Sequence, residues 1–83
     1  MHRDIKLENI LVTQGDKGEN MTIKLTDFGF ACFFADENQM NVNLGTPCYM
    51  APEIIKKKPY GSGVDIWAMG VLAHIIVTGR QPF

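Results

Sequence analysis

The residues best suited to chemistry lie near the start of the chain. The stretch HRDIKLEN at residues 2–9 brings Asp4, Lys6 and Asn9 together, and Asp27 follows later. The oxygens of Asn9 and Asp27 are hard ligands of the kind that Mg²⁺ prefers, and this ion is usually completed by water and substrate phosphates. Lys6 can balance charge on a phosphoryl group, and Asp4 can accept a proton from a hydroxyl. Together these residues predict Mg²⁺-dependent phosphoryl transfer to an alcohol.

A β-hairpin is predicted to position these side chains. Residues 10–13 are rich in β-branched side chains, and residues 21–26 alternate apolar and polar side chains. The stretch QGDKGEN between the two runs contains the Gly, Asp and Asn that are typical of turns. Antiparallel pairing of the runs would place Asn9 and Asp27 side by side at the open end of the hairpin.

The rest of the chain predicts a long loop and two helices. Residues 28–47 show little periodicity, and long loops of this kind are usually functional or mobile. Residues 51–58 predict a short helix with Pro52 in its first turn. Ser62 is predicted to cap a longer helix that stops at Gly79. Because this helix is apolar nearly all round, we predict that it is buried, although three or four elements cannot cover it on every side.

Composition excludes several classes of protein. The chain has 83 residues, 46% of them hydrophobic, which predicts at most one globular domain. A net charge of -1 argues against nucleic acid as a partner. The longest apolar run, residues 66–77, is shorter than the ~20 residues of a bilayer-spanning helix. Cys32 and Cys48 are too few for a disulfide framework, so a reduced cytoplasmic compartment is predicted, with the nucleus left open.

Several motifs of the chain resemble those of the eukaryotic protein kinase family. HRDIKLEN is similar to the catalytic loop, DFG at residues 27–29 to the metal-binding turn, and APE at residues 51–53 to the end of the activation segment. GTPCYMAPE, DIWAMGVL and TGRQPF extend the likeness through the chain. The resemblance implies an α+β fold in which residues 1–83 are a partial catalytic domain. This fragment of the large lobe would contain a β-hairpin, a long activation segment, a short helix and a long buried helix.

The resemblance also implies a function and a set of site residues. The function is transfer of the γ-phosphate of ATP to a serine or threonine of a protein substrate. Asp4 would be the catalytic base, and Lys6 and Thr46 would contact it and mark the serine/threonine branch. Asn9 and Asp27 would hold Mg²⁺.

The remaining implied contacts are with the nucleotide and the loop backbone. Leu11 would lie under the adenine, Glu8 near the ribose, and Thr26 along the pocket that ends at Asp27. Asp65 would accept hydrogen bonds from the backbone of the Asp4 loop while stabilising its own helix.

Two departures from the family pattern affect regulation and activity. In the family, Arg3 pairs with a phosphorylated residue, but residues 30–44 contain no Ser, Thr or Tyr. We hypothesise that Asp36 or Glu37 supplies the negative charge instead. No G-x-G-x-x-G loop and no V-A-I-K-like run occurs in the chain, so we expect these residues to lack the small lobe of the domain. The resemblance implies that the C-terminal helices of the large lobe are absent as well.

Two interpretations remain open for the chain. The first is the central piece of a serine/threonine kinase, inactive as an isolated 83-residue chain. The second is a non-catalytic, kinase-derived fragment that binds or regulates a partner through its apolar faces. In both, the missing kinase segments or a partner would have to cover the apolar helix.

Overall fold

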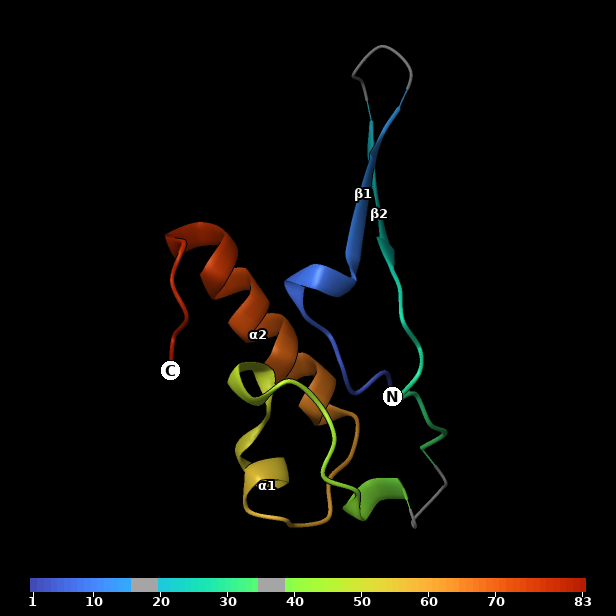
Figure 1. The fold of residues 1–83 in the computed structure, drawn as a ribbon, viewed down its shortest axis with the longest axis vertical. Helices are drawn as coiled ribbons and strands as arrows, with labels where there is room; N and C mark the ends of the chain where they lie inside the picture. The colour runs from blue at the N-terminus through green and yellow to red at the C-terminus, as the bar shows by residue number, and fades with distance from the viewer. Residues whose placement is uncertain (16–19, 35–38) are drawn as a thin grey trace.

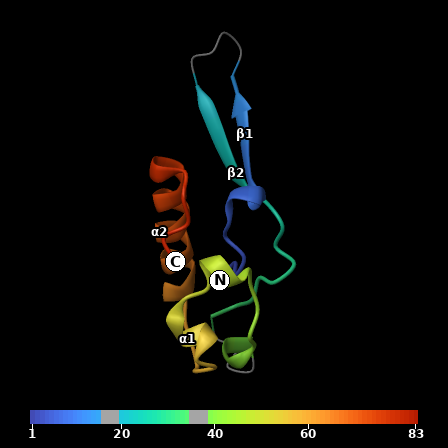
Figure 2. The same ribbon diagram turned by 60° about the vertical axis from the view of Figure 1, so that its left-hand side comes forward.

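The fold consists of a two-stranded hairpin that projects from a helical body (Figures 1 and 2). A computed structural model describes residues 1–15, 20–34 and 39–83 of the chain. In chain order the helices and strands are β1 (Ile10–Gln14), β2 (Met21–Leu25), α1 (Pro52–Ile55) and α2 (Gly63–Thr78). The molecule is elongated, with extents of 47 × 27 × 16 Å. Short 3-10 helices lie at Leu7–Asn9, Gln39–Asn41 and Pro47–Tyr49.

The predicted antiparallel hairpin is confirmed. Its register runs from the pair Ile10 and Leu25 at the base to the pair Gln14 and Met21 at the far end. β2 ends one residue before the prediction because Asn9, the residue opposite Thr26, belongs to the 3-10 helix Leu7–Asn9. The N–H and hydroxyl of Thr26 both donate to the carbonyl of Asn9, at 2.9 and 3.1 Å. These bonds close the base of the hairpin. Four residues of the predicted turn, 16–19, lie outside the described residues.

The short helix is shorter than predicted. α1 covers Pro52–Ile55, with Pro52 in its first turn as predicted, and does not extend to Lys58. Lys56 is the C-cap residue, and Lys57 has a left-handed backbone with φ of 55°. Because a left-handed residue cannot continue a right-handed helix, the chain turns away there. The three lysines at residues 56–58, which the predicted helix included, therefore lie outside it.

The long helix ends as predicted but begins differently. Gly79 takes the left-handed conformation (φ 70°) and donates its N–H to Ile75 at 2.8 Å, which is a common helix end. Ser62 occupies the N-cap position, but its backbone is helical and its side chain makes no cap hydrogen bond. The prediction of a side-chain cap is therefore wrong. The extended backbone that a serine cap needs is missing at Ser62.

One face of α2 forms the core of the molecule. Two clusters of buried side chains pack along it, namely Ile5, Tyr49, Ala68 and Val71, and Ala51, Ile54, Tyr60 and Val64. The opposite face is uncovered, and Val77 is 83% exposed. The helix predicted to be buried is thus covered on one side, because a chain of this length cannot surround it. No helix in the described part of the chain has the length and apolar character needed to cross a membrane.

Candidate active site

The Asp4 carboxylate is the centre of a buried polar cluster. Asp4 is 9% exposed, and its Oδ1 accepts a hydrogen bond from the Thr46 hydroxyl at 2.9 Å. The Lys6 ammonium donates to the same hydroxyl at 3.0 Å and lies 3.5 Å from the other Asp4 oxygen. Thr46 is 42 residues away from Asp4 in sequence, so this contact depends on the loop that carries Thr46 folding back over the start of the chain. The side chains of Thr46 and Lys6 hold the carboxylate in one orientation.

Asn9 connects this cluster to the base of the hairpin. Its side chain is buried, and its amide nitrogen donates to the Asp4 carbonyl at 2.8 Å and to Asp4 Oδ2 at 3.3 Å. Because the nitrogen edge of the amide faces Asp4, the oxygen edge faces away from it. That oxygen is placed to accept a cation or a donor from outside the cluster.

Asp27 extends from the same base. It follows Thr26, whose N–H and hydroxyl are bonded to Asn9, so Asp27 lies next to Asn9 across the open end of the hairpin. Its backbone is left-handed (φ 60°), and its carboxylate is exposed and accepts the Gly29 N–H at 3.2 Å. Left-handed residues other than glycine are uncommon and often occur at functional sites. The strained backbone here directs a carboxylate into solvent, where a metal ion can reach it.

α2 holds the loop that carries Asp4 through Asp65. The two oxygens of this carboxylate accept the backbone N–H groups of His2 and Arg3, at 2.8 and 2.9 Å. The His2 ring adds a second link, because its Nδ1 accepts the Asp4 N–H at 3.1 Å and its Nε2 lies 3.0 Å from the Thr26 carbonyl. The pairing fixes the tautomer with the proton on Nε2. His2 also contacts the Phe28 ring edge to face at 4.9 Å.

Comparison with known proteins identifies this arrangement. A family model described as "Protein kinase domain" matches residues 1–83. The chain belongs to the protein kinase family. Over its whole length it is 45% identical to calcium/calmodulin-dependent protein kinase type II alpha chain of Drosophila melanogaster and 46% identical to serine/threonine-protein kinase pakA of Talaromyces marneffei. It is also 46% identical to calcium-dependent protein kinase 32 of Arabidopsis thaliana.

The kinase chain spans only a small part of these relatives. It covers 16% of the Drosophila protein, 12% of pakA and 15% of the Arabidopsis protein. The family, the serine/threonine branch and the α+β class that were predicted from the sequence are confirmed by these matches. The small share of each relative that the chain covers fits the predicted fragment of a kinase.

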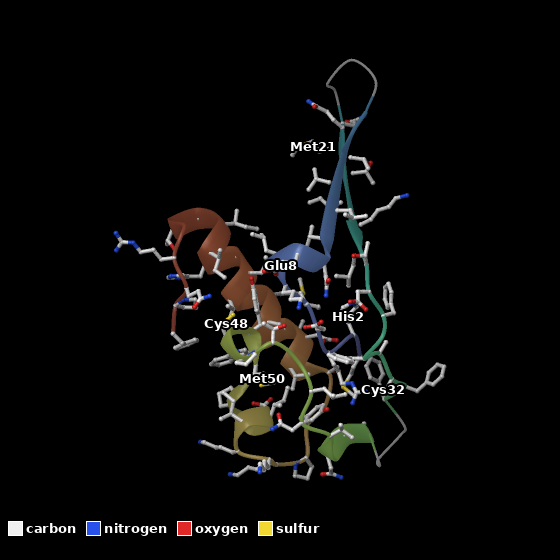
Figure 3. All side chains as sticks on the ribbon, in the orientation of Figure 1. His2, Glu8, Met21, Cys32, Cys48 and Met50 are labelled. Carbon is white, nitrogen blue, oxygen red and sulfur yellow. The ribbon has the colours of Figure 1, made fainter. Side chains whose placement is uncertain are left out.

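The structure brings the kinase chain's predicted site residues together to different degrees. Asp4, Lys6, Asn9 and Thr46 form the connected cluster, and Thr26 lies at the hairpin base beside them. Glu8 and Leu11 lie in the short helix and in β1 at the foot of the hairpin, where both are exposed; Figure 3 labels Glu8. Nothing among the described residues covers them, so their nucleotide contacts remain predictions. Asp36 and Glu37, the hypothesised partners of Arg3, lie outside the described residues.

Two tyrosines of the site were not predicted from the sequence. The Tyr49 hydroxyl accepts the backbone N–H of Leu7 at 3.3 Å, and the Tyr60 hydroxyl accepts from the Arg3 guanidinium at 3.1 Å. Both hydroxyls reach the catalytic loop from more than 40 residues away. No local pattern in the sequence marks such contacts, because each tyrosine also fits an ordinary role in the core.

Replacing Asp65 is expected to release the catalytic loop. In Asp65→Asn one of the two oxygens becomes an NH₂ group, which faces a backbone N–H that it cannot accept. The loss of a charge-assisted bond and the unsatisfied donor should lower the free energy of unfolding by about 2–4 kcal/mol. Denaturant unfolding of the complete polypeptide measures this loss. The matched acid-to-amide control, Glu8→Gln at an exposed position, should change it by less than about 0.5 kcal/mol, and equal losses in both variants would contradict the anchoring role.

Gly45 is expected to tolerate no side chain. Its φ of +125° lies in a region that L residues rarely adopt, and a Cβ there would lie 3.2 Å from the Arg3 carbonyl oxygen. Gly45→Ala should therefore destabilise the complete polypeptide by about 1–3 kcal/mol and displace the neighbouring Thr46. Gly61→Ala is the control, because a Cβ at Gly61 meets nothing within 4 Å and its φ is not positive. Equal melting temperatures for the two variants would show that this close approach does not matter.

Proposed function

We propose that the complete protein carrying these residues transfers the γ-phosphate of ATP to serine or threonine hydroxyls of protein substrates. One observation carries the proposal: the Asp4 carboxylate, held by Thr46 and Lys6, lies beside Asn9 at the hairpin base from which Asp27 extends. A proton acceptor, a cation and two hard oxygen ligands are thereby brought to one place. Their combination suits phosphoryl transfer to an alcohol.

Each residue of the cluster has a separate role in this proposal. Asp4 accepts the proton of the attacking hydroxyl, which requires a carboxylate of fixed direction. Thr46 supplies that direction through its bond to Oδ1. Lys6 places its positive charge next to the same carboxylate and offsets negative charge on the transferring phosphoryl group. Thr46 also belongs to the loop on which we propose that the protein substrate docks.

The residues of the hairpin base fit a magnesium ion and a nucleotide. The amide oxygen of Asn9 and the exposed carboxylate of Asp27 are hard donors, and two protein ligands suit an ion that keeps waters and binds phosphates. Mg²⁺, when bound, neutralises charge on the phosphates of ATP. We assign Glu8, Leu11 and Thr26 to the nucleotide, because all three lie at or near the hairpin base.

The proposal is tested by phosphotransfer from labelled ATP. The complete polypeptide is incubated with Mg²⁺ and with peptides that present serine, threonine or tyrosine as the only hydroxyl. Label is expected on serine or threonine peptides, and removal of Mg²⁺ by a chelator should abolish it. Label on the tyrosine peptide alone, or transfer that persists without divalent metal, would contradict the proposal.

The exposed face of α2 supports a second candidate, a kinase-derived fragment that binds a partner. Ile66, Ile76 and Val77 lie uncovered on this helix, and large exposed apolar patches usually mark contact surfaces. If the chain is part of a complete kinase, further segments of the catalytic domain cover the same face. Phosphotransfer by the complete polypeptide distinguishes the two, because a binding fragment needs no Asp4, Asn9 and Asp27 together.

A cytoplasmic or nuclear location completes the proposal. Cys32 and Cys48 are both free thiols in the structure, which suits a reducing compartment.

A further inference from the structure

Tyr60 connects the catalytic loop to the segment that leads to Thr46. Its side chain is 6% exposed and packs in the cluster with Ala51, Ile54 and Val64. Its hydroxyl donates to the Val42 carbonyl at 2.6 Å and accepts from Arg3 Nη1 at 3.1 Å. Its backbone N–H donates to the Met40 carbonyl at 3.1 Å. Tyr60 therefore holds the 40–42 segment at two points, one of them through its hydroxyl.

Arg3 is the other side of this connection. Its guanidinium is buried, its Nε donates to the Phe30 carbonyl at 2.5 Å, and its backbone N–H is bonded to Asp65. A guanidinium keeps its charge in proteins, so burial requires acceptors in fixed positions. The Tyr60 hydroxyl is one such acceptor. Because the cation polarises this hydroxyl, its own donation to Val42 is strengthened.

The position of Val42 affects the reacting centre directly. Two residues separate Val42 from Gly45, and Gly45 precedes Thr46, whose hydroxyl is bonded to Asp4. A shift of the 40–42 segment is therefore passed along a short stretch of backbone to the carboxylate. Residues 30–44 contain no Ser, Thr or Tyr, so no hydroxyl in this stretch can carry a phosphoryl group that would fix it in place. The hydrogen bonds of Tyr60 to Val42 and Met40 are contacts from outside the stretch that help to fix it.

We propose that Tyr60 is a positioning residue for phosphoryl transfer, which sets the place of Thr46 beside Asp4 by linking Arg3 to the Val42 carbonyl. The kinetic part of this inference rests on the proposed function. The ordering part concerns the 39–44 segment alone and can be tested without catalysis.

Tyr60→Phe tests the inference, because it keeps the buried ring and removes only the hydroxyl. In the complete polypeptide we expect backbone hydrogen exchange in peptides covering residues 39–44 to become about tenfold faster, as loss of a charge-assisted hydrogen bond predicts. We expect kcat for a peptide substrate to fall about tenfold through misplacement of Thr46. The KM for ATP should stay the same, since the hairpin base is untouched. A general loss of structure would change both constants.

The control removes a hydroxyl far from this connection. Thr13→Val deletes an exposed hydroxyl of β1 that lies 3.4 Å from the Thr22 carbonyl, and it should change neither exchange at 39–44 nor kcat. A folded Tyr60→Phe protein with unchanged exchange and kcat overturns the proposal. A fall in kcat that is matched by a rise in the KM for ATP overturns it as well.

Arg3→Lys carries the test if Tyr60→Phe does not fold. This variant removes the guanidinium that donates to Tyr60 but leaves the tyrosine ring in the core. Faster exchange at residues 39–44 supports the proposal, and unchanged exchange overturns it. If the unaltered polypeptide shows no phosphotransfer, the proposed function fails, whereas the exchange measurement still decides whether Tyr60 orders the segment.

Discussion

Asp4→Asn is expected to lower the kcat of the complete kinase by about 10²–10⁴-fold, the range over which a general base contributes. In the unaltered protein the Thr46 hydroxyl donates to Asp4 Oδ1. The substitution keeps the shape of the side chain, and its amide can still form a hydrogen bond with this hydroxyl. It removes the carboxylate that we propose as the acceptor of the proton of the substrate hydroxyl. Steady-state kinetics with a serine peptide at saturating ATP measure the change.

Two measurements show that the Asp4→Asn effect is chemical. Nucleotide affinity should remain unchanged, because the assigned nucleotide residues lie at the hairpin base. The melting temperature should change little, because the side-chain amide of Asn9 can still donate to the backbone carbonyl of residue 4. A kcat within threefold of the unaltered enzyme, in a protein that binds ATP normally, would show that Asp4 is not the base.

Asp27→Asn is expected to abolish most of the magnesium-dependent activity. In the unaltered protein the Gly29 N–H donates to Asp27 Oδ1 at 3.2 Å. The amide oxygen of the variant can still accept this N–H, so the local turn should be preserved. The substitution removes the negative charge that we propose attracts the metal ion. Because a bound metal contributes several kcal/mol of charge stabilisation in the transition state, kcat/KM should fall by about 10²–10³-fold.

Titration with Mg²⁺ separates this loss from a folding defect. The Asp27→Asn protein should need a higher Mg²⁺ concentration for half-maximal activity, while its affinity for ATP in the absence of metal stays the same. Asp4→Asn serves as the matched acid-to-amide comparison, because it should lower kcat without moving the Mg²⁺ midpoint. An unchanged midpoint in Asp27→Asn would remove Asp27 from the metal site.

Much of the local structure could be predicted from the sequence. The alternation in residues 21–26 and the turn residues before it predict the hairpin, since side chains of a strand alternate between its faces. Gly79 marks the end of α2 because glycine adopts the left-handed backbone at little cost. Both signals act over a few residues, and both are confirmed. Asn9 and Asp27 could be placed at one end of the hairpin for the same reason.

The sequence prediction is wrong where distant contacts or unusual backbone angles determine the ends of helices and strands. The end of α1 depends on Lys57, a residue with no intrinsic preference for its left-handed backbone. β2 ends before Thr26 because Asn9, the residue opposite it, belongs to a 3-10 helix. Ser62 adopts a helical backbone, which no cap signal in the sequence excludes.

The sequence by itself determined which reactive groups the kinase chain has, their order, and the hairpin and helix that carry them. The resemblance to the family implied the contacts of Asp65 with the Asp4 loop and of Thr46 with Asp4, and the tertiary structure supplied their geometry. Only the tertiary structure decided how Tyr60 joins Arg3 to Val42. The physical reason is the distance along the chain over which each interaction acts. Strand alternation and helix ends reflect backbone preferences within a few residues, whereas these hydrogen bonds join groups that come together only after the chain has packed around α2.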